Sequence, residues 1–322
     1  MQKMLNDIEE ITFEITNRCN LQCKICNIWK ENKKKDTSLE NIKKILESFH
    51  QPLAISLTGG EPLLHPDFDR IYKYIYKLFL QKKVKNIDIS TNAYSTDIIN
   101  FLSNNKRYLQ PLTLSISLDG LEKNHNKQRG KKDAFSKTLD NIMKIKKYNI
   151  TPTIKFVITD MNYKDLPRVH KLSESLGLSF NCKLVEKINS YYHRYSDNDF
   201  LSLSLKNFPF VQKIITQIYR KQKNKKNNME YFSLSYIKKF LSSGNLNFIK
   251  KCATPEKSLF VTSTNGIYSC LYQEKIGDTK NWPNLNWEKH EKILNIAKNG
   301  KCLKCLSYHG YLREFNYPLE KI

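Results

Sequence analysis

Three cysteines, Cys19, Cys23 and Cys26, lie within eight residues near the start of the chain, separated by three residues and then by two. Zinc in a structural site takes four ligands, so three thiols on one loop would need a distant fourth. A 4Fe–4S cluster bound by three thiolates leaves one iron open, and that iron can bind a small chelating molecule. The spacing therefore indicates a reactive iron–sulfur cluster, with zinc or unrelated thiols as the alternatives.

The length and cysteine usage limit the class of protein. A chain of 322 residues suits one large α/β unit with a smaller appendage. The start, MQKMLNDIEEITFEIT, has charges where a signal peptide needs an apolar stretch, and no run approaches a membrane span. We expect a cytoplasmic protein that does not contact a membrane. In that reducing compartment, eight cysteines are expected to be metal ligands or catalytic thiols rather than disulfides.

The formal net charge of +23 raises the question of nucleic-acid binding. Lysine supplies 46 of the 54 basic residues and arginine only eight, which is typical of a compositional bias rather than of a phosphate-reading surface. The densest run, KQKNKKNN at 221–228, is typical of a solvated loop. Nucleic acid is therefore not the expected partner, although the charge favours anionic partners in general.

Short β-branched runs alternate with amphipathic stretches through residues 1–185, which predicts repeated βα units. Six such units imply parallel strands in a partial, TIM-like (β/α)6 barrel of the α/β class. A helical connecting segment at 186–245, a small C-terminal α+β domain at 246–310 and a tail at 311–322 are expected to follow. The predicted strands are 11–16, 53–59, 85–91, 112–120, 151–159 and 178–185, and the predicted helices are 38–50, 67–82, 96–106, 134–148 and 163–176.

The cysteine loop directly follows the first predicted strand, so it belongs at the C-terminal mouth of the barrel, where such folds keep their chemistry. Three further motifs follow the next three strands: TGGEP at 58–62, STNA at 90–93 and SISLDG at 115–120. In this order the four motifs resemble those of the radical S-adenosylmethionine (SAM) superfamily. The resemblance covers roughly residues 9–185. Ala93 departs from it, because glycine is common at that position.

The resemblance implies that the open iron is chelated by the amino and carboxylate groups of SAM. Segment 59–62 would receive the amino group, 90–92 the ribose, Ser117 and Arg129 the carboxylate, and the end of the fifth strand the adenine. The cofactor-binding residues implied in this way are Gly59, Gly60, Glu61, Pro62, Ser90, Thr91, Asn92, Ser117, Arg129, Val157 and Ile158. The implied reaction is reductive cleavage of SAM to a 5′-deoxyadenosyl radical, which abstracts a hydrogen atom from a substrate C–H bond.

Four more cysteines lie in the last third of the chain, at Cys252, Cys270, Cys302 and Cys305. Their pattern resembles the auxiliary-cluster domains of the SPASM and twitch subgroups, and four thiols fit a second, fully ligated 4Fe–4S cluster that accepts an electron. Zinc is the alternative, with CLKC at 302–305 as a zinc knuckle. A hairpin with its turn at 264–266 is predicted in the same region.

Cys182 stands apart, in the sixth predicted strand, where it shares a face with Phe180 and Leu184. A lone buried cysteine is usually a small hydrophobic residue. The alternative is that it points into the barrel and gives a hydrogen atom to a substrate radical, an arrangement that resembles some radical SAM peptide epimerases.

The substrate is the least determined part of the interpretation. Members with an auxiliary cluster act on peptides or on small molecules such as sugars and cyclitols. Only ten residues precede the first predicted strand, which favours an oxidoreductase acting on a small molecule over a peptide maturase or epimerase with a leader-gripping segment. Candidate substrate contacts are Tyr191, Tyr192, His193 and Arg194. A reducing partner such as flavodoxin or ferredoxin is expected. The alternative of another class is a non-catalytic zinc or iron–sulfur module that binds nucleic acid.

Overall fold

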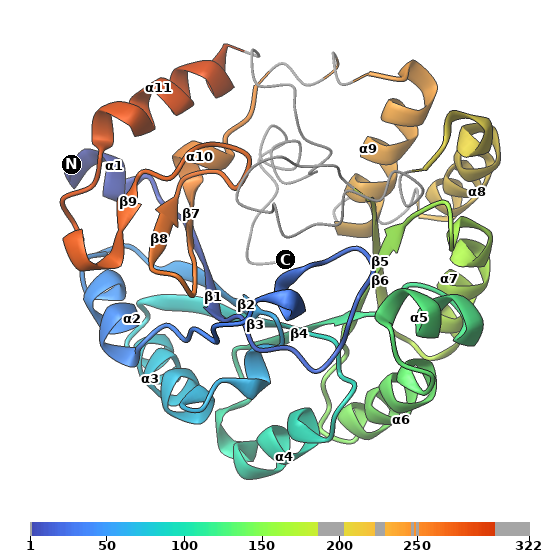
Figure 1. Ribbon diagram of the computed structural model, residues 1–322, viewed down its shortest axis with the longest axis horizontal. Coiled ribbons are helices and arrows are strands. Elements are labelled where there is room, and N and C mark those ends of the chain that lie inside the picture. Colours follow the sequence, from blue (N-terminus) through green and yellow to red (C-terminus); the bar gives the residue numbers. More distant parts are fainter. Residues whose placement is uncertain (1, 186–202, 223–228, 246–247, 249–250, 300–322) are drawn as a thin grey trace.

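The computed structural model describes residues 2–185, 203–222, 229–245, 248 and 251–299, and one curved sheet forms its centre (Figure 1). The strand order in the sheet is β6-β5-β4-β3-β2-β1-β7-β8-β9. Strands β1 to β6 run parallel, each beside the next in sequence, as predicted for a partial barrel. The strands are β1 Glu10–Thr16, β2 Leu53–Gly59, β3 Val84–Thr91, β4 Leu112–Ser117, β5 Thr153–Ile158, β6 Ser179–Leu184, β7 Ser258–Val261, β8 Gly266–Tyr268 and β9 Gly277–Asp278.

Helices cover the outer side of this curved sheet, so its concave side faces the middle of the molecule (Figure 1). The described parts of the predicted connecting segment form α8 and α9, which lie beyond β6. The helices are α1 Gln2–Asn6, α2 Leu39–Leu46, α3 Phe68–Leu80, α4 Asp97–Asn104, α5 Glu122–Arg129, α6 Ala134–Lys146, α7 Leu166–Ser175, α8 Phe208–Lys221, α9 Met229–Ser243, α10 Thr254–Lys257 and α11 Trp287–Lys298. No helix in the described ranges is long and apolar enough to cross a membrane.

Side-chain periodicity explains which face of each element is buried. In α3, Ile71, Ile75 and Leu78 recur at spacings of four and three and are all buried, as the sequence predicts. In β3, Ile87 and Ile89 are fully buried in the core between sheet and helices. Asp88, which lies between them, points to the opposite, concave face, because successive side chains of a strand alternate.

The C-terminal hairpin continues the barrel's own sheet. Strand β7 pairs with β1 in parallel from Glu10↔Ser258 to Phe13↔Val261, and β8 then pairs antiparallel with β7. Residue Asn265 has a φ of 69° in the connection between β7 and β8, which lies at the predicted turn. This hairpin belongs to the predicted small C-terminal α+β domain, and its first strand, β7, is hydrogen-bonded to strand β1 of the barrel.

Candidate functional site

The cysteine loop follows β1, and its two ends are held together at the base. The side chain of Asn17 donates a hydrogen bond to the carboxylate of Glu31 over 3.0 Å. Arg18 and Asp36 form an ion pair of 3.0 Å, and the hydroxyl of Thr16 donates to the same Asp36 carboxylate over 2.6 Å. The loop is therefore fixed at the C-terminal end of β1 before it reaches the second and third cysteines.

The far side of the loop is docked on the C-terminal end of α5. The N–H groups of Gln22 and Lys24 donate to the carbonyls of Arg129 and Gln128, over 3.2 and 2.8 Å. The last carbonyls of a helix have no partner within the helix, so the loop satisfies two of them. Gly130 follows with a φ of 72°, and a Cβ there would lie 2.5 Å from the carbonyl oxygen of Gln22. This close approach requires glycine.

The three thiols predicted to bind a cluster lie on this one loop, Cys23 buried and the other two half-buried. Burial raises the pKa of the Cys19 thiol to about 12 and raises that of Cys23, although the guanidinium of Arg129 opposes the rise at Cys23. Such thiols need nearby positive charge to become thiolates, and iron would supply it. In the described part of the chain, no three His, Cys, Asp or Glu side chains already stand in a metal-binding arrangement.

The glycine pair of TGGEP lies against the backbone of the cysteine loop. The N–H groups of Gly60 and Glu61 donate to the carbonyls of Thr16 and Arg18, over 2.9 and 2.7 Å. A Cβ on Gly60 would lie 2.2 Å from the Arg18 oxygen and 2.9 Å from Cβ of Cys19. Three thiols of suitable donor chemistry, on a loop held from both sides, fit a cluster at this position.

Glu61, predicted to contact SAM, is a fully buried carboxyl group that joins the ends of β2 and β3. Its carboxylate accepts hydrogen bonds from the N–H of Asn92 and from the hydroxyl of Thr91, both over 2.8 Å. Pro62 follows it and begins a short 3-10 helix, Pro62–Leu64. Burial raises the pKa of Glu61 to about 7, against these hydrogen bonds, which favour the ionised form. Its side chain therefore holds the predicted ribose-binding segment in place.

The predicted ribose-binding residues form a compact turn at the end of β3. The side chain of Asn92 donates to Oδ1 of Asn20 over 2.9 Å, which links this turn to the cysteine loop. Ser90 lies on the concave face and donates to Asp88 over 3.4 Å. Ala93 has a φ of 50°, a conformation that costs an L-residue roughly 1–2 kcal/mol and explains why glycine suits this position.

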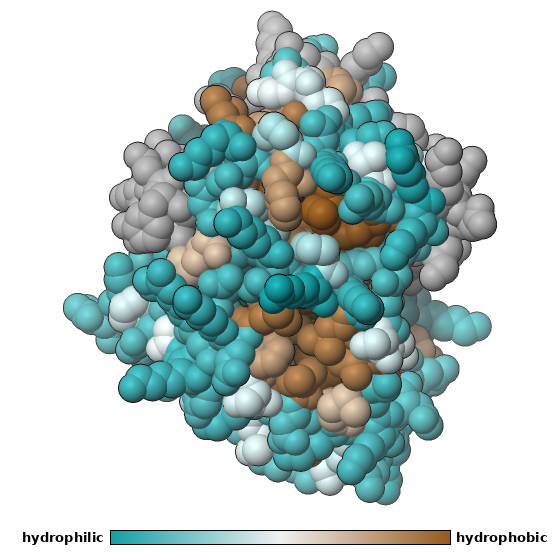
Figure 2. All heavy atoms as spheres, turned by 90° about the vertical axis from the view of Figure 1, so that its right-hand side faces the viewer, coloured by the Kyte–Doolittle hydropathy of each residue, from teal (hydrophilic) through white to brown (hydrophobic). Residues whose placement is uncertain are grey.

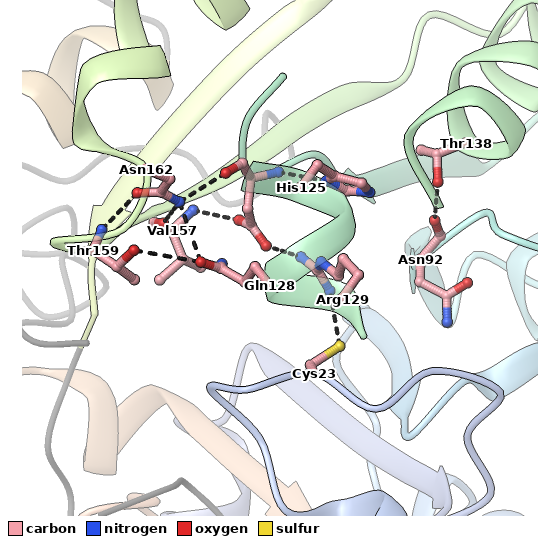
Figure 3. Close-up of polar contacts among 10 residues, drawn as sticks. Cys23, Asn92, His125, Gln128, Arg129, Thr138, Val157, Thr159 and Asn162 are labelled. Atoms are coloured by element: carbon pink, nitrogen blue, oxygen red, sulfur yellow. Dashed lines mark hydrogen bonds and ion pairs between the residues drawn. The ribbon is translucent and has the colours of Figure 1, made fainter. Parts of the chain in front are cut away.

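Arg129 is buried beside Cys23. Its Nη1 lies 3.7 Å from Sγ of Cys23, and its Nη2 is paired with the carboxylate of Asp119 (Figure 3). Arg129 is the residue predicted to contact the SAM carboxylate, and Asp119 is not among the predicted site residues. The signal for Asp119 was present in SISLDG, where an acidic residue follows directly on a buried strand.

The remaining predicted cofactor contacts lie at the ends of β4 and β5. Ser117 is half-buried and is paired in register with Lys155. Val157 is half-buried, and its N–H donates to Asp119 over 2.8 Å. Ile158 is fully buried in the core, because its side chain alternates to the helix-covered face. Of the two residues predicted to lie against adenine, Val157 alone has its side chain on the concave face.

A polar cluster that was not among the predicted site residues lies on the concave face of the sheet. Asp88 accepts hydrogen bonds from the hydroxyls of Thr113 and Ser115, each over 3.0 Å, in addition to that from Ser90. Burial raises its pKa, and the positive charge of Lys155 opposes this. The three hydroxyls and the carboxyl group come from β3 and β4. No single stretch of sequence contains them at a recognisable spacing.

Cys182 shares a face of β6 with Phe180 and Leu184, as expected, and that face packs on the outer helices. It is 1% exposed and in register with Phe156, another core residue. Phe180 makes a ring contact with His170 of α7 at 5.1 Å. Burial raises the pKa of the Cys182 thiol, with Glu230 of α9 adding to the effect. The thiol is thus directed away from the concave face.

The C-terminal cysteine group is described in part. Cys270 is buried after β8, and Cys252 is half-buried, with its N–H donating to the carbonyl of Ala297 in α11 over 3.2 Å. Cys302 and Cys305 lie outside the described residues. The candidate substrate contacts Tyr191, Tyr192, His193 and Arg194 lie outside them as well.

Comparisons with known sequences agree with this geometry. Residues 13–172 match the family model of the radical SAM superfamily. The chain is 27% identical over 170 residues to the antilisterial bacteriocin subtilosin biosynthesis protein AlbA of Bacillus subtilis, covering 52% of this chain and 37% of that protein. It is 26% identical to the probable GTP 3′,8-cyclase of Methanocaldococcus jannaschii, covering 60% of this chain and 66% of the relative. The chain spans less than two thirds of the length of these curated relatives.

Solved structures share the fold along most of the chain. The structure of anSMEcpe with bound AdoMet superposes with a TM-score of 0.67 at 20% identity, covering 94% of this chain and 87% of that chain. Streptococcus suis SuiB bound to S-adenosylmethionine gives a TM-score of 0.62 at 14% identity, covering 95% of this chain and 74% of that chain. The shared feature is the α/β partial barrel.

Proposed function

The chain belongs to the radical SAM superfamily, and from this premise we propose that it cleaves SAM reductively and abstracts a hydrogen atom from a bound substrate. The proposal rests on one observation: the cysteine loop is held in place from two sides. Its backbone is held by the N–H groups of Gly60 and Glu61 on one side and by the C-terminal end of α5 on the other. A surface loop whose thiols bind nothing would not need to be fixed on both sides in this way.

A bound 4Fe–4S cluster and SAM would supply the reductive cleavage and the 5′-deoxyadenosyl radical. The residues of the chain would hold and orient them. Cys19, Cys23 and Cys26 would ligate the cluster, and Arg129 would contact the SAM carboxylate with a charge-assisted hydrogen bond. Glu61 would keep the turn at 91–92 in position for the ribose, because its carboxylate accepts hydrogen bonds from the hydroxyl of Thr91 and from the N–H of Asn92. Such positioning matters, since an ångström of misplacement can cost about 100-fold in rate.

The test is production of 5′-deoxyadenosine by anaerobically reconstituted protein given dithionite and SAM. The wild type should form it, and Cys19→Ala, Cys23→Ala and Cys26→Ala should each abolish it. Cys182→Ala is the matched control, since it also removes one thiol but from the core behind the sheet. Its SAM cleavage should persist. A wild-type chain that binds zinc alone, or a cluster that does not respond to SAM, would refute the proposal.

For the substrate class we favour a peptide, contrary to the preference derived from the sequence alone. The support is the names of two relatives. One is AlbA, a bacteriocin biosynthesis protein. The other is the sporulation killing factor maturation protein SkfB of Bacillus subtilis, 26% identical over 170 residues that cover 52% of this chain and 40% of that protein.

The second candidate is an oxidoreductase that acts on a sugar, a cyclitol or another small hydroxylated molecule. The observation in its favour is the cluster of Asp88, Ser90, Thr113 and Ser115 on the concave face, because a carboxyl group among hydroxyls suits a polyol. Asp88→Asn should then raise the KM for such a substrate and leave uncoupled SAM cleavage unchanged. Peptides and polyols, offered with SAM under turnover conditions, can be compared by substrate-dependent formation of 5′-deoxyadenosine.

A peptide epimerase that uses Cys182 as hydrogen donor is the most specific form of the peptide proposal. The core position of this thiol gives that form no support, because the thiol faces α9 rather than the concave face. Turnover in deuterated water tests whether Cys182 donates the hydrogen atom. Solvent deuterium in the product, lost together with turnover in Cys182→Ala, would establish the donor role.

We also propose that Cys252, Cys270, Cys302 and Cys305 bind a second 4Fe–4S cluster, which accepts the electron left on the substrate, and that a flavodoxin or ferredoxin reduces the enzyme. About eight irons per chain would support two clusters. About four irons with one zinc would assign zinc to the C-terminal group and leave the first proposal intact.

A further inference from the structure

The guanidinium group of Arg129 contacts the sulfur of Cys23, and a role in binding SAM does not by itself explain this contact. Its Nη1 is within 3.7 Å of the Cys23 sulfur, and its Nη2 pairs with Asp119. Its Nε is buried, with no hydrogen-bond partner among the described residues. A guanidinium has five N–H donors, so these contacts leave donors, Nε–H among them, for a ligand carboxylate. Contact with Cys23 and contact with SAM are therefore compatible.

Asp119 fixes this arrangement, because each of its polar atoms is engaged. One carboxylate oxygen pairs with Arg129, and the other accepts from the N–H of Val157 over 2.8 Å. Its carbonyl accepts from the side chain of Asn162 over 2.8 Å, and its N–H donates to Nδ1 of His125 over 3.1 Å. The side chain is fully buried. These contacts on both carboxylate oxygens and on the backbone fix the side chain, which in turn holds the guanidinium in one place.

We propose that Arg129 tunes the reduction potential of the predicted cluster through the Cys23 sulfur, and that Asp119 is the positioning residue that aims it there. The inference rests on the proposed function, since it requires the cluster. Reduction adds an electron to a cluster whose charge is shared with its sulfur ligands. A cation donating an N–H to one of those sulfurs stabilises the reduced form more than the oxidised form, so it raises the potential.

The experiment is a redox titration of full-length reconstituted protein without SAM, followed by electron paramagnetic resonance. The cluster signal that changes on adding SAM identifies the relevant cluster and separates it from any second one. Arg129→Gln should move its midpoint potential to more negative values. Arg18→Gln is the matched control, because it removes the same charge from the cysteine loop, where the guanidinium of Arg18 is paired with Asp36. Its shift should be much smaller.

The role of Asp119 is tested in two backgrounds. Asp119→Asn should shift the potential by different amounts in the otherwise wild-type protein and in Arg129→Gln, because the part of its effect that acts through the guanidinium is absent once Arg129 is replaced. A merely structural role would give the same additional shift in both backgrounds. The double variant also removes one positive and one negative charge together, so it leaves the net charge beside the cluster unchanged. If either single variant fails to fold, the double variant must still show a potential more negative than that of the wild type.

Failure of this inference is distinguishable from failure of the proposed function. A chain that takes up no iron–sulfur cluster, or whose cluster ignores SAM, refutes the proposed function. A chain that carries the cluster and cleaves SAM, but whose potential is the same in Arg129→Gln and wild type, refutes the tuning role of Arg129 and leaves the proposed function standing.

Discussion

Glu61 shows how one buried side chain organises two of the motifs. It comes from TGGEP, yet its carboxylate binds the backbone and hydroxyl of the STNA turn on the next strand. An ionised carboxylate in this position has lost its water and has only neutral donors around it, which is why burial raises its pKa to about 7. The two motifs are thus one structural unit at the mouth.

The stability of the metal-free chain should therefore depend on pH through Glu61. The pKa of Glu61 in the folded chain lies above the ordinary glutamate value of 4.5, so the native state holds the proton more tightly. The stabilisation is complete below about pH 4.5 and is lost as the pH rises through about 7, a loss on the order of 3 kcal/mol. Urea unfolding of the wild type should show this decline relative to Glu61→Gln. The exposed Glu291→Gln should follow the wild type, and parallel profiles for Glu61→Gln and wild type would contradict the assignment.

Among single residues, the sequence predicts those that belong to a motif with a recognisable spacing and misses those that do not. The three cysteines, the glycine pair and Arg129 follow from motifs, and the structure brings Arg129 within 3.7 Å of Cys23. Asp88 binds hydroxyls from its own strand and from β4, so its surroundings depend on strand register. Register is set by the whole sheet and cannot be read from a single stretch of sequence.

Among the elements of the barrel, α5 is a helix that the sequence did not predict. Its residues, EKNHNKQR, contain no apolar stripe, and the side chains it buries are those of His125, Gln128 and Arg129. Periodicity methods look for apolar faces, so a helix whose buried face is polar escapes them. The helix buries polar groups because it presents its last carbonyls and a guanidinium to the cysteine loop.

Two glycines allow a direct test of that docking. Gly130 and Gly177 both follow helices with positive φ, 72° and 65°, so alanine at either should cost roughly 1–2 kcal/mol of backbone strain. A Cβ at Gly130 would also lie 2.5 Å from the Gln22 carbonyl, whereas nothing lies within 4 Å at Gly177. Gly130→Ala should therefore displace the cysteine loop and lower the iron bound per chain. Gly177→Ala should lose similar backbone stability with full iron content. Equal iron content in the two variants would show that docking on α5 does not support the cluster site.

For the whole molecule, the sequence predicts a small C-terminal domain after the barrel but not the strand that this domain joins, and the structure continues the barrel's sheet from β1 into β7, β8 and β9. The hydroxyl of Ser263 donates to the buried carboxylate of Glu14 in β1 over 2.5 Å, and Trp282 packs on Phe49 with ring centroids 5.9 Å apart. Strand β7 has only four residues, and its partner β1 lies some 250 positions earlier, from Glu10↔Ser258 to Phe13↔Val261. Local patterns identify such a hairpin but cannot indicate the strand it joins.

Continuity of the sheet predicts that the barrel depends on the C-terminal segment even without a second cluster. A chain ending at residue 251 would expose the edge of β1 and lose the burial of Leu259, Val261 and Ile267, each worth about 1.5–3 kcal/mol. A chain ending at residue 299 also lacks Cys302 and Cys305 but keeps β7 to β9 and α11. The shorter chain should unfold at least about 10 °C below the longer one in metal-free calorimetry. Equal transition temperatures would mean that β1 to β6 are stable alone, and that the hairpin serves only to carry its cysteines.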